Sequence, residues 1–252
     1  MSARQEVFGV AVDSVDQGGA IGAILARARD GVPGYVVTPN LDHVMKLRRD
    51  TAFRNAYRGA SLVLPDGRPL LWMARLRGKQ LHLVTGSDLV VPLCRAASRE
   101  GRSVFLFGST FEAVTRCARN LYAVDRTLNI AGVYAPPTGF ERDAEEQARA
   151  LDAIKAAAPD LLFVALGAPR QEIWAHNNVA GLGSQVICVG AALDFIAGTQ
   201  RRAPLPFRKA GLEWLWRAAT QPRRLALRYA NILCWLPLLV ALDLRDAMRR
   251  AR

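Results

Sequence analysis

Short apolar runs alternate with amphipathic stretches along the first two hundred residues. Runs at 104–107, 161–165 and 186–189 are rich in β-branched and aromatic residues, and stretches with helical periodicity at 112–120 and 143–157 lie between them. Buried strands separated by helices of about ten to fifteen residues are typical of parallel β-α-β units with helices on both faces. The pattern therefore predicts an α/β fold with a Rossmann-like, mostly parallel sheet flanked by helices.

The pattern changes after residue 200. Residues 201–252 carry twelve Lys or Arg against three acids, which is nine of the twelve net positive charges of the chain. Cations interleaved with Trp and Leu suit an anionic lipid surface, although an ordinary amphipathic helix packed on its own core would also give this pattern. We therefore expect an α/β core at 1–200 and a basic, amphipathic, helical C-terminal appendage at 201–252.

Composition narrows the function classes. No apolar stretch reaches the roughly eighteen residues that a membrane span needs, and the polar N-terminus contains no signal-peptide core. No nucleic-acid module accompanies the basic residues, so we expect no nucleic-acid partner. The four scattered cysteines have no disulfide or metal-ligand spacing and are predicted to be buried thiols of a cytosolic protein. They are Cys94, Cys117, Cys188 and Cys234.

Glycine-bearing turns end three of the predicted strands. In doubly wound sheets, ligands bind beyond the carboxyl ends of the strands, where glycine lets a phosphate approach backbone N–H groups. Strand–turn–helix junctions also use glycine for geometry alone, and no turn matches a dinucleotide fingerprint or a Walker loop. Together the three turns favour a nucleotide pocket. They are Gly108-Ser109, Gly167-Ala168-Pro169 and Gly190-Ala191-Ala192.

Polar residues follow two predicted strands in the first half of the chain. Thr38 and Asn40 come directly after the run at 36–37, and Asp66 follows the run at 62–64. At neighbouring strand ends these groups would converge, and a carboxylate placed there can take a proton from a sugar hydroxyl. The alternative is a simple backbone turn, because Pro-Asp-Gly is common in turns.

A series of ordered motifs extends these observations over about four-fifths of the chain. The motifs are Thr38-Pro39-Asn40, Pro65-Asp66-Gly67, Thr85-Gly86-Ser87-Asp88-Leu89, Gly167-Ala168-Pro169-Arg170-Gln171-Glu172, Gly190-Ala191-Ala192-Leu193-Asp194, Arg202-Ala203-Pro204, Glu213-Trp214, Pro222-Arg223 and Arg228-Tyr229. With these motifs the chain resembles the WecG/TagA/CpsF family of bacterial glycosyltransferases, glycosyltransferase family 26.

The resemblance implies an inverting, metal-independent transferase without a cofactor. Such an enzyme moves a hexose or N-acetylhexosamine from a UDP-sugar to a polyprenyl-diphosphate-linked sugar, in the biosynthesis of exopolysaccharide, capsule, teichoic acid or common antigen. It implies a cytoplasmic protein bound peripherally to the anionic inner face of the plasma membrane, with a C-terminal appendage that helps to complete the active site. Family members also form homo-oligomers.

The resemblance and the strand-end pattern together give three groups of candidate site residues. Asp66 matches the proposed catalytic base, with Thr38, Asn40 and Gln171 beside it, and Glu172 is assigned a structural role. The UDP-sugar candidates are Gly108, Ser109, Phe140, Gly167, Pro169, Gly190 and Asp194. The candidates for the acceptor diphosphate or the membrane are Arg202, Arg217, Arg223 and Arg228.

Two departures from the family pattern affect these assignments. Leu83 occupies a position that is usually arginine, so Arg75, Arg77, Lys79 or an arginine of the appendage would have to supply that charge. Phe140 stands where tyrosine is frequent, which removes a hydroxyl.

A nucleotide-binding oxidoreductase and a non-catalytic membrane adapter remain alternative functions at this point.

Overall fold

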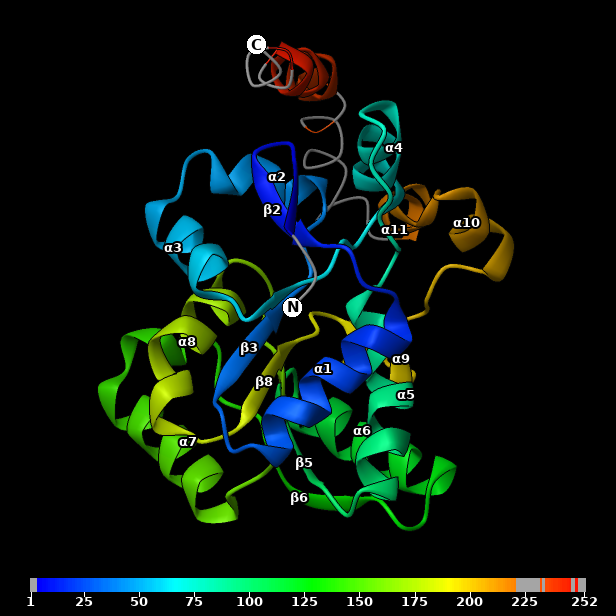
Figure 1. Ribbon diagram of the computed structural model, residues 1–252. Helices are drawn as coiled ribbons and strands as arrows, with labels where there is room; N and C mark the ends of the chain where they lie inside the picture. The colour runs from blue at the N-terminus through cyan, green and yellow to red at the C-terminus, as the bar shows by residue number, and fades with distance from the viewer. Residues whose placement is uncertain (1–3, 221–231, 233, 246–247, 249–252) are drawn as a thin grey trace.

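A six-stranded sheet forms the centre of the molecule (Figure 1). The structure is a computed structural model that describes residues 4–220, 232, 234–245 and 248. The strand order is β4-β3-β8-β7-β5-β6, and every neighbouring pair runs parallel, which confirms the predicted fold class. The strands are β3 (Gly34–Val37), β4 (Leu62–Val63), β5 (Ser103–Gly108), β6 (Asn129–Tyr134), β7 (Leu161–Ala165) and β8 (Gln185–Cys188).

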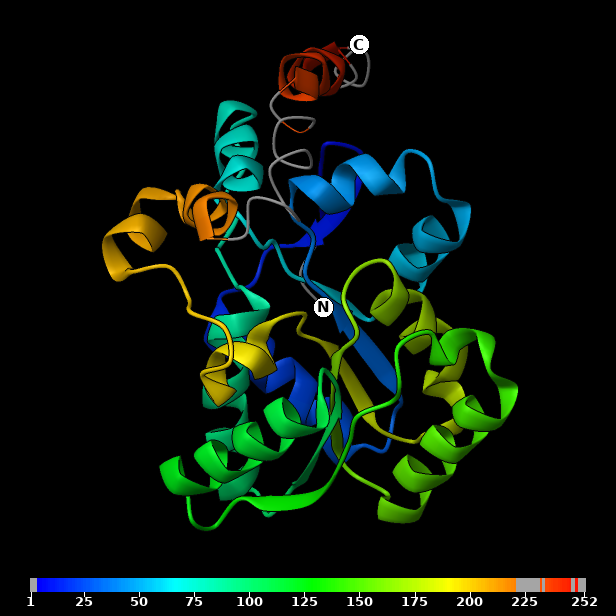
Figure 2. The ribbon, with the colours of Figure 1, turned by 180° about the vertical axis from the view of Figure 1, so that it is seen from behind.

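Helices cover both faces of this sheet, so the body has three layers (Figures 1 and 2). Side chains alternate along β3: Tyr35 and Val37 join the apolar cluster under α3, α7 and α8, whereas Val36 joins the cluster under α1, α5, α6 and α9. The helices are α1 (Gln17–Arg29), α2 (Leu41–Leu47), α3 (Thr51–Gly59), α4 (Arg68–Leu76), α5 (Gly86–Arg99), α6 (Phe111–Val124), α7 (Ala144–Ala157), α8 (Arg170–Asn178) and α9 (Ala192–Ala197), with the 3₁₀ turns η1 (Phe140–Arg142) and η2 (Val179–Gly181).

The helices predicted at 112–120 and 143–157 are confirmed as α6 and α7. Thr110 begins α6, because its side chain accepts a hydrogen bond from the N–H of Ala113. Asp143 is the N-cap of α7 and not its first residue, since it accepts from the N–H groups of Glu145 and Glu146. Polar caps therefore set the start of both helices.

An antiparallel hairpin, β1 (Arg4–Val7) with β2 (Val10–Asp13), lies beside β4. Asp13 ties it to the sheet, because one carboxylate oxygen accepts the N–H of Val63 at 2.7 Å and the other pairs with Arg4 at 3.3 Å. The hairpin thereby covers the edge of the sheet next to β4.

The C-terminal part of the chain extends from the carboxyl end of the sheet (Figure 1). It contains α10 (Leu205–Ala210), α11 (Glu213–Thr220) and a further helix at 234–245. Leu239 is buried in the cluster that contains Val7, and Asp243 forms a largely buried ion pair of 2.9 Å with Arg77 just after α4. The helix at 234–245 is therefore packed on the body.

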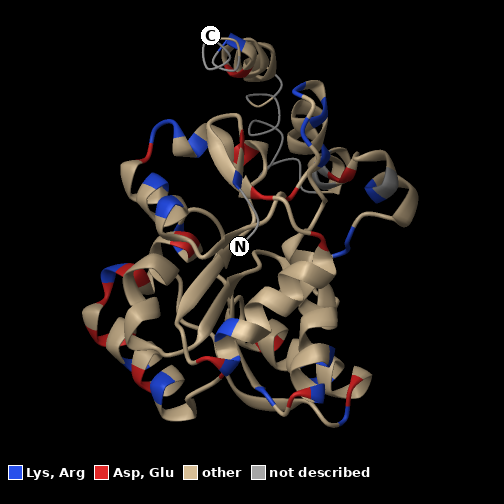
Figure 3. Ribbon diagram, viewed as in Figure 1, with Lys and Arg blue, Asp and Glu red and all other residues tan. Residues whose placement is uncertain are grey.

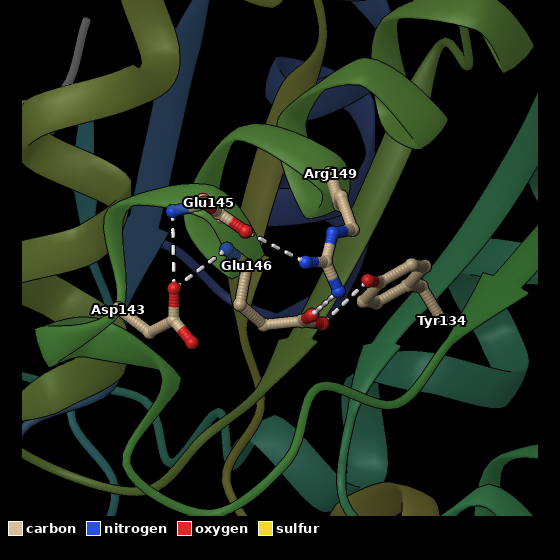
Figure 4. A network of polar contacts seen from close by, with 5 residues as sticks. All are labelled: Tyr134, Asp143, Glu145, Glu146 and Arg149. Carbon is tan, nitrogen blue, oxygen red and sulfur yellow. Dashed lines mark hydrogen bonds and ion pairs between the residues drawn. The ribbon is translucent and has the colours of Figure 1, made fainter.

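A compact polar network fastens α7 to β6 (Figure 4). The buried carboxylate of Glu146 accepts hydrogen bonds from the hydroxyl of Tyr134 at 2.6 Å and from Arg149 at 3.0 Å. Arg149 also pairs with Glu145 at 3.1 Å. Every group in the network has a partner within one helix turn or on the adjacent strand, so its role is structural.

Two expectations from composition have separate outcomes. Cys94, Cys117 and Cys188 are buried free thiols as predicted, but the prediction is wrong for Cys234, whose side chain is exposed on the last helix. None of the described helices combines the length and the hydropathy that a bilayer crossing requires.

Candidate active site at the carboxyl end of the sheet

Asp66 lies where β3 and β4 end side by side. Val37 is paired with Val63, and just beyond these two residues the N–H of Asp66 donates to the carbonyl of Pro39 at 2.8 Å. Gly67 follows with a φ of 134°, a conformation that favours glycine, and a Cβ at this residue would lie 3.7 Å from the Cβ of Asn40. The structure thus brings Asp66 and Asn40 together, as the strand-end pattern predicts.

Asn40 also has a structural task. Its side-chain oxygen accepts the N–H of His43 at 3.2 Å and caps α2. This cap holds the side chain at the strand end beside Gly67 and leaves the amide N–H₂ to donate elsewhere.

The loop that begins α5 closes onto the same place. A Cβ at Gly86 would lie 3.2 Å from the Cα of Val189 and 3.5 Å from Oγ1 of Thr38, so a side chain there would crowd the backbone after β8. The start of α5 therefore meets the ends of β3 and β8 around the buried Thr38. Glycine in this motif allows that close approach.

Arg202 is the appendage arginine that the structure places against the start of α5. Its guanidinium donates to Asp88 at 2.7 Å, and Asp88 also accepts from the hydroxyl of Thr85 at 2.8 Å. Burial acts to raise the pKa of Asp88, but the hydrogen bonds from Arg202 and Thr85 outweigh it and lower that pKa. Burial acts to lower the pKa of Arg202, but the hydrogen bond and the charge of Asp88 outweigh it and raise that pKa, with smaller contributions from Glu213 and Asp66.

Gln171 is buried and its amide joins two elements. Its oxygen accepts the N–H of Gly190 at 3.1 Å, and its nitrogen donates to Glu172 at 2.8 Å. These bonds fix the backbone turn after β8. The structure gives Gln171 a positioning role, and a direct part in the reaction stays a prediction.

Glu172 is fully buried beneath this turn. One of its oxygens accepts from Gln171, and the other has no hydrogen-bond partner among the described residues. Burial raises the pKa of Glu172 to about 7, while the hydrogen bond from Gln171 and the charge of Lys46 act against that rise. Lys46 is itself paired with Asp42 at 2.7 Å.

Tyr57 and His43 complete the polar group under the strand ends. The hydroxyl of Tyr57 lies 2.6 Å from Nδ1 of His43, and both side chains are buried. Burial and then the nearby charge of Glu172 raise the pKa of the Tyr57 hydroxyl. Sequence reasoning missed this pair, because His43 and Tyr57 belong to none of the motifs and lie on different helices, α2 and α3.

The three glycine-bearing turns lie on adjacent strands β5, β7 and β8, as predicted. At Gly108, with φ of 106°, a Cβ would lie 2.7 Å from the carbonyl of Ala165, so only glycine fits between β5 and β7. The hydroxyl of Ser109 donates to Asp194 at 2.5 Å, and Gln200 donates to the same carboxylate at 3.0 Å. Asp194 thus links the end of β5 to α9, whereas Gly167 and Pro169 form the turn between β7 and α8.

Comparison with known proteins identifies the family of the chain. A profile described as "Glycosyl transferase WecG/TagA/CpsF family" matches residues 5–252. The chain belongs to this family. It is 30% identical over 193 residues to an "N-acetylglucosaminyldiphosphoundecaprenol N-acetyl-beta-D-mannosaminyltransferase" of Bacillus spizizenii, covering 75% of this chain and 72% of the relative. A Staphylococcus aureus protein of the same name is 31% identical over 194 residues, covering 76% of this chain and 74% of the relative.

Membership of the WecG/TagA/CpsF family confirms the resemblance, whereas the site residues carried over from it stay predictions. Phe140 is buried and stacks edge-to-face on Phe107, with ring centroids 5.8 Å apart. Its ring therefore belongs to the core under α7, because that apolar layer covers the sheet there. The assignment of Phe140 to the UDP-sugar site stays a prediction.

The appendage arginines of this family member are only partly placed. Arg223, Arg228 and the side chain of Arg217 lie outside the described residues. Leu83 is exposed, and two of its suggested substitutes, Arg77 and Lys79, both donate to the carbonyl of Glu6. Arg202 is the appendage candidate whose side chain the structure describes, and it donates to Asp88 at 2.7 Å.

The described residues contain no group of three His, Cys, Asp or Glu side chains that could hold a metal ion. The prediction of a metal-independent reaction without cofactors is not tested by this observation.

Proposed function

We propose that the chain transfers a hexose or N-acetylhexosamine from a UDP-sugar to a polyprenyl-diphosphate-linked sugar, with inversion and without a metal ion. One observation carries the proposal: in a member of this glycosyltransferase family, Asp66 lies at paired strand ends beside Asn40. The relatives are named as enzymes that add N-acetylmannosamine to N-acetylglucosaminyl-diphosphoundecaprenol, which favours that donor and that acceptor.

In the proposed reaction Asp66 acts as the general base. Its carboxylate takes the proton of the acceptor hydroxyl as the hydroxyl oxygen bonds to the anomeric carbon, and the bond from that carbon to the diphosphate oxygen breaks. The proton remains on Asp66 and the negative charge leaves with UDP. Attack from the face opposite the leaving group inverts the anomeric configuration.

The departing UDP requires positive charge or N–H donors. Arg202 offers a fork of N–H groups suited to a phosphate, and its present partner Asp88 holds the guanidinium in place until a substrate phosphate arrives. The turns at Gly108, Gly167 and Gly190 provide backbone N–H groups at the carboxyl end of the sheet, where nucleotides bind in doubly wound folds.

The proposal includes the subcellular location of the protein. A basic appendage and a lipid-linked acceptor favour peripheral binding to the inner face of the plasma membrane. A homo-oligomer stays a prediction.

A donor screen tests the proposal. The chain is incubated with a short-chain polyprenyl-diphosphate N-acetylglucosamine and each of several UDP-sugars, in parallel with and without EDTA. We expect one N-acetylhexosamine donor to dominate, a product of inverted anomeric configuration by NMR, and equal rates in EDTA. Transfer from no UDP-sugar would contradict the function, and activity that EDTA abolishes and manganese restores would contradict the metal-free mechanism.

A further inference from the structure

Helix α4 presents large apolar side chains to solvent although it belongs to the first third of the chain. Trp72 is 52% exposed and Leu76 is 71% exposed, while Leu70, Met73 and Ala74 face the core. The two exposed residues are one helical turn apart on the same face, and Arg75 lies between them in sequence. Isolated exposed apolar residues are common, but a Trp–Leu pair on one face is not explained by the packing of α4.

Two contacts hold α4 against the appendage. At its first residue, Arg68 packs so closely on the α10–α11 junction that a Cβ at Gly211 would lie 2.5 Å from the Arg68 side chain. Just after its last residue, Arg77 forms the buried ion pair with Asp243 of the helix at 234–245. Both ends of α4 are therefore attached to parts of the appendage that are far away in sequence (Figures 1 and 2).

These contacts place α4 at the same end of the molecule as the appendage. Among the described residues, ten of the fourteen large exposed hydrophobic side chains lie on α4, the loop after it, α10, the α10–α11 junction, α11, the helix at 234–245 and residue 248. They are Trp72, Leu76, Leu83, Leu205, Leu212, Leu215, Trp235, Leu238, Leu244 and Met248. We refer to the surface formed by these ten residues as the apolar end.

Charge indicates what covers the apolar end. Residues 68–79 contain four cations and no acid, and residues 201–252 carry a net charge of +9. Figure 3 shows basic positions along α4, whereas acidic and basic positions are mixed around α7 on the opposite flank. A second copy of the chain would bring the same positive charge to this surface, whereas a bilayer with anionic headgroups complements both the cations and the apolar residues.

We propose that α4 is a membrane-contacting element in its own right, inserting Trp72 and Leu76 among the headgroups of an anionic bilayer next to the appendage. The inference rests on the proposed function, in which the acceptor is a membrane lipid. Helix α4 begins two residues after Asp66 and is about 13 Å long, so the bilayer surface that it contacts lies close to the catalytic base. The membrane-contacting surface then includes residues from both halves of the chain.

Site-specific fluorescence tests the proposal with the full chain. In a Cys234→Ser background, which removes the exposed thiol, an environment-sensitive fluorophore is attached to Leu76→Cys or, as the matched control, to Val124→Cys. Val124 is 47% exposed and is the last residue of α6, which leads into β6, the edge strand opposite β4. Vesicles of phosphatidylcholine with phosphatidylglycerol should shift the emission of the probe at 76 to the blue and leave the probe at 124 unchanged.

Flotation of the same vesicles provides the second measurement. Trp72→Asp/Leu76→Asp should reduce partitioning into the anionic vesicles by about tenfold or more, while Tyr122→Asp/Val124→Asp should not change it. An unshifted probe at 76 on vesicle-bound protein, or unchanged flotation of the α4 variant, would overturn the proposal. A fall in oligomer size without any effect on flotation would assign the surface to a second copy instead.

Neither measurement uses a sugar substrate. Failure of glycosyl transfer in the donor screen therefore refutes the proposed function without deciding the role of α4, and an unshifted probe refutes the role of α4 without affecting the donor screen.

Discussion

Two buried glutamates, Glu146 and Glu172, are compensated in different ways. Glu146 is 8% exposed and accepts hydrogen bonds from Tyr134 and Arg149 (Figure 4). Glu172 is 0% exposed, accepts one side-chain bond from the neutral amide of Gln171, and has no arginine partner among the described residues. Both carboxylates lie on helices that flank the same sheet, so burial alone does not distinguish their roles.

This difference in partners shows which of the two buried carboxylates costs the folded state free energy when it is charged. A buried carboxylate with a cation and a hydroxyl is satisfied and holds a helix in place. A buried carboxylate without such partners costs free energy when charged, and groups of this kind concentrate at functional sites. The position of Glu172 beneath Gln171 and Gly190 fits that rule, whereas Glu146 lies on α7 and accepts its hydrogen bond from the adjacent strand β6.

The largest expected effect is on the pH dependence of stability. The pKa of Glu172 is about 7 in the folded chain and 4.5 ordinarily, so between these values the folded state holds a proton that the unfolded state has lost. Its contribution to the free energy of unfolding therefore falls as pH rises from 4.5 to 7, by on the order of 3 kcal/mol. Urea unfolding from pH 4.5 to 7.5 measures this fall as the difference between the native chain and Glu172→Gln. A constant difference would contradict the assignment.

The next effect concerns the other glutamate. Glu146→Ala leaves the hydroxyl of Tyr134 and one side of Arg149 without their acceptor, so we expect a loss of about 2 kcal/mol in the free energy of unfolding. Glycosyl transfer at a temperature well below unfolding should not change. Glu145→Ala serves as the control, because its exposed ion pair with Arg149 is worth about 0.5 kcal/mol or less. Equal losses in the two variants would remove the structural role of Glu146.

A smaller effect is expected on the reaction when the partner of Gln171 is removed. Glu172→Ala frees the amide that holds the turn at Gly190, and we expect kcat/KM to fall about tenfold, which corresponds to about 1.4 kcal/mol. Glu172→Gln retains an acceptor oxygen and should restore most of the rate. If the alanine and glutamine variants lose activity equally, the charge of Glu172 matters and its hydrogen bond to Gln171 does not.

The smallest effect is that of a single hydroxyl. Tyr134→Phe removes the bond to Glu146 but keeps the ring on β6 and the charge of Arg149 beside the carboxylate. We expect a loss of about 0.5–1 kcal/mol in the free energy of unfolding, measured by urea titration. A loss as large as that of Glu146→Ala would mean that the ion pair with Arg149 contributes nothing.

The sequence was sufficient for the fold class and for the strand-end position of Asp66. Apolar runs predict β5, β7 and β8 because buried parallel strands need apolar residues on both faces, and polar residues after a run mark its end. The glycine motifs predicted the turns, because strand–turn–helix junctions use glycine for its backbone geometry. Asp66 and Asn40 could be related because neighbouring strand ends meet at one edge.

Contacts between distant segments were not predictable in the same way. The pairing of Arg202 with Asp88 joins residues 114 positions apart, and no periodic pattern relates them. The burial of Phe140 was not predictable either, because an aromatic residue after a glycine turn is compatible with either a binding site or a core. Glu172 was read as structural, although its lack of a charged partner becomes visible only when its surroundings are known.

The central claim is that Asp66 takes the proton from the acceptor hydroxyl, and two measurements on Asp66→Asn test it. Isothermal calorimetry of UDP binding and single-turnover transfer to the lipid-linked acceptor are compared with those of the native chain. We predict that UDP binds with nearly unchanged affinity while transfer falls by about 10² or more, as expected when a general base is lost. Transfer at the native rate in Asp66→Asn would contradict the account.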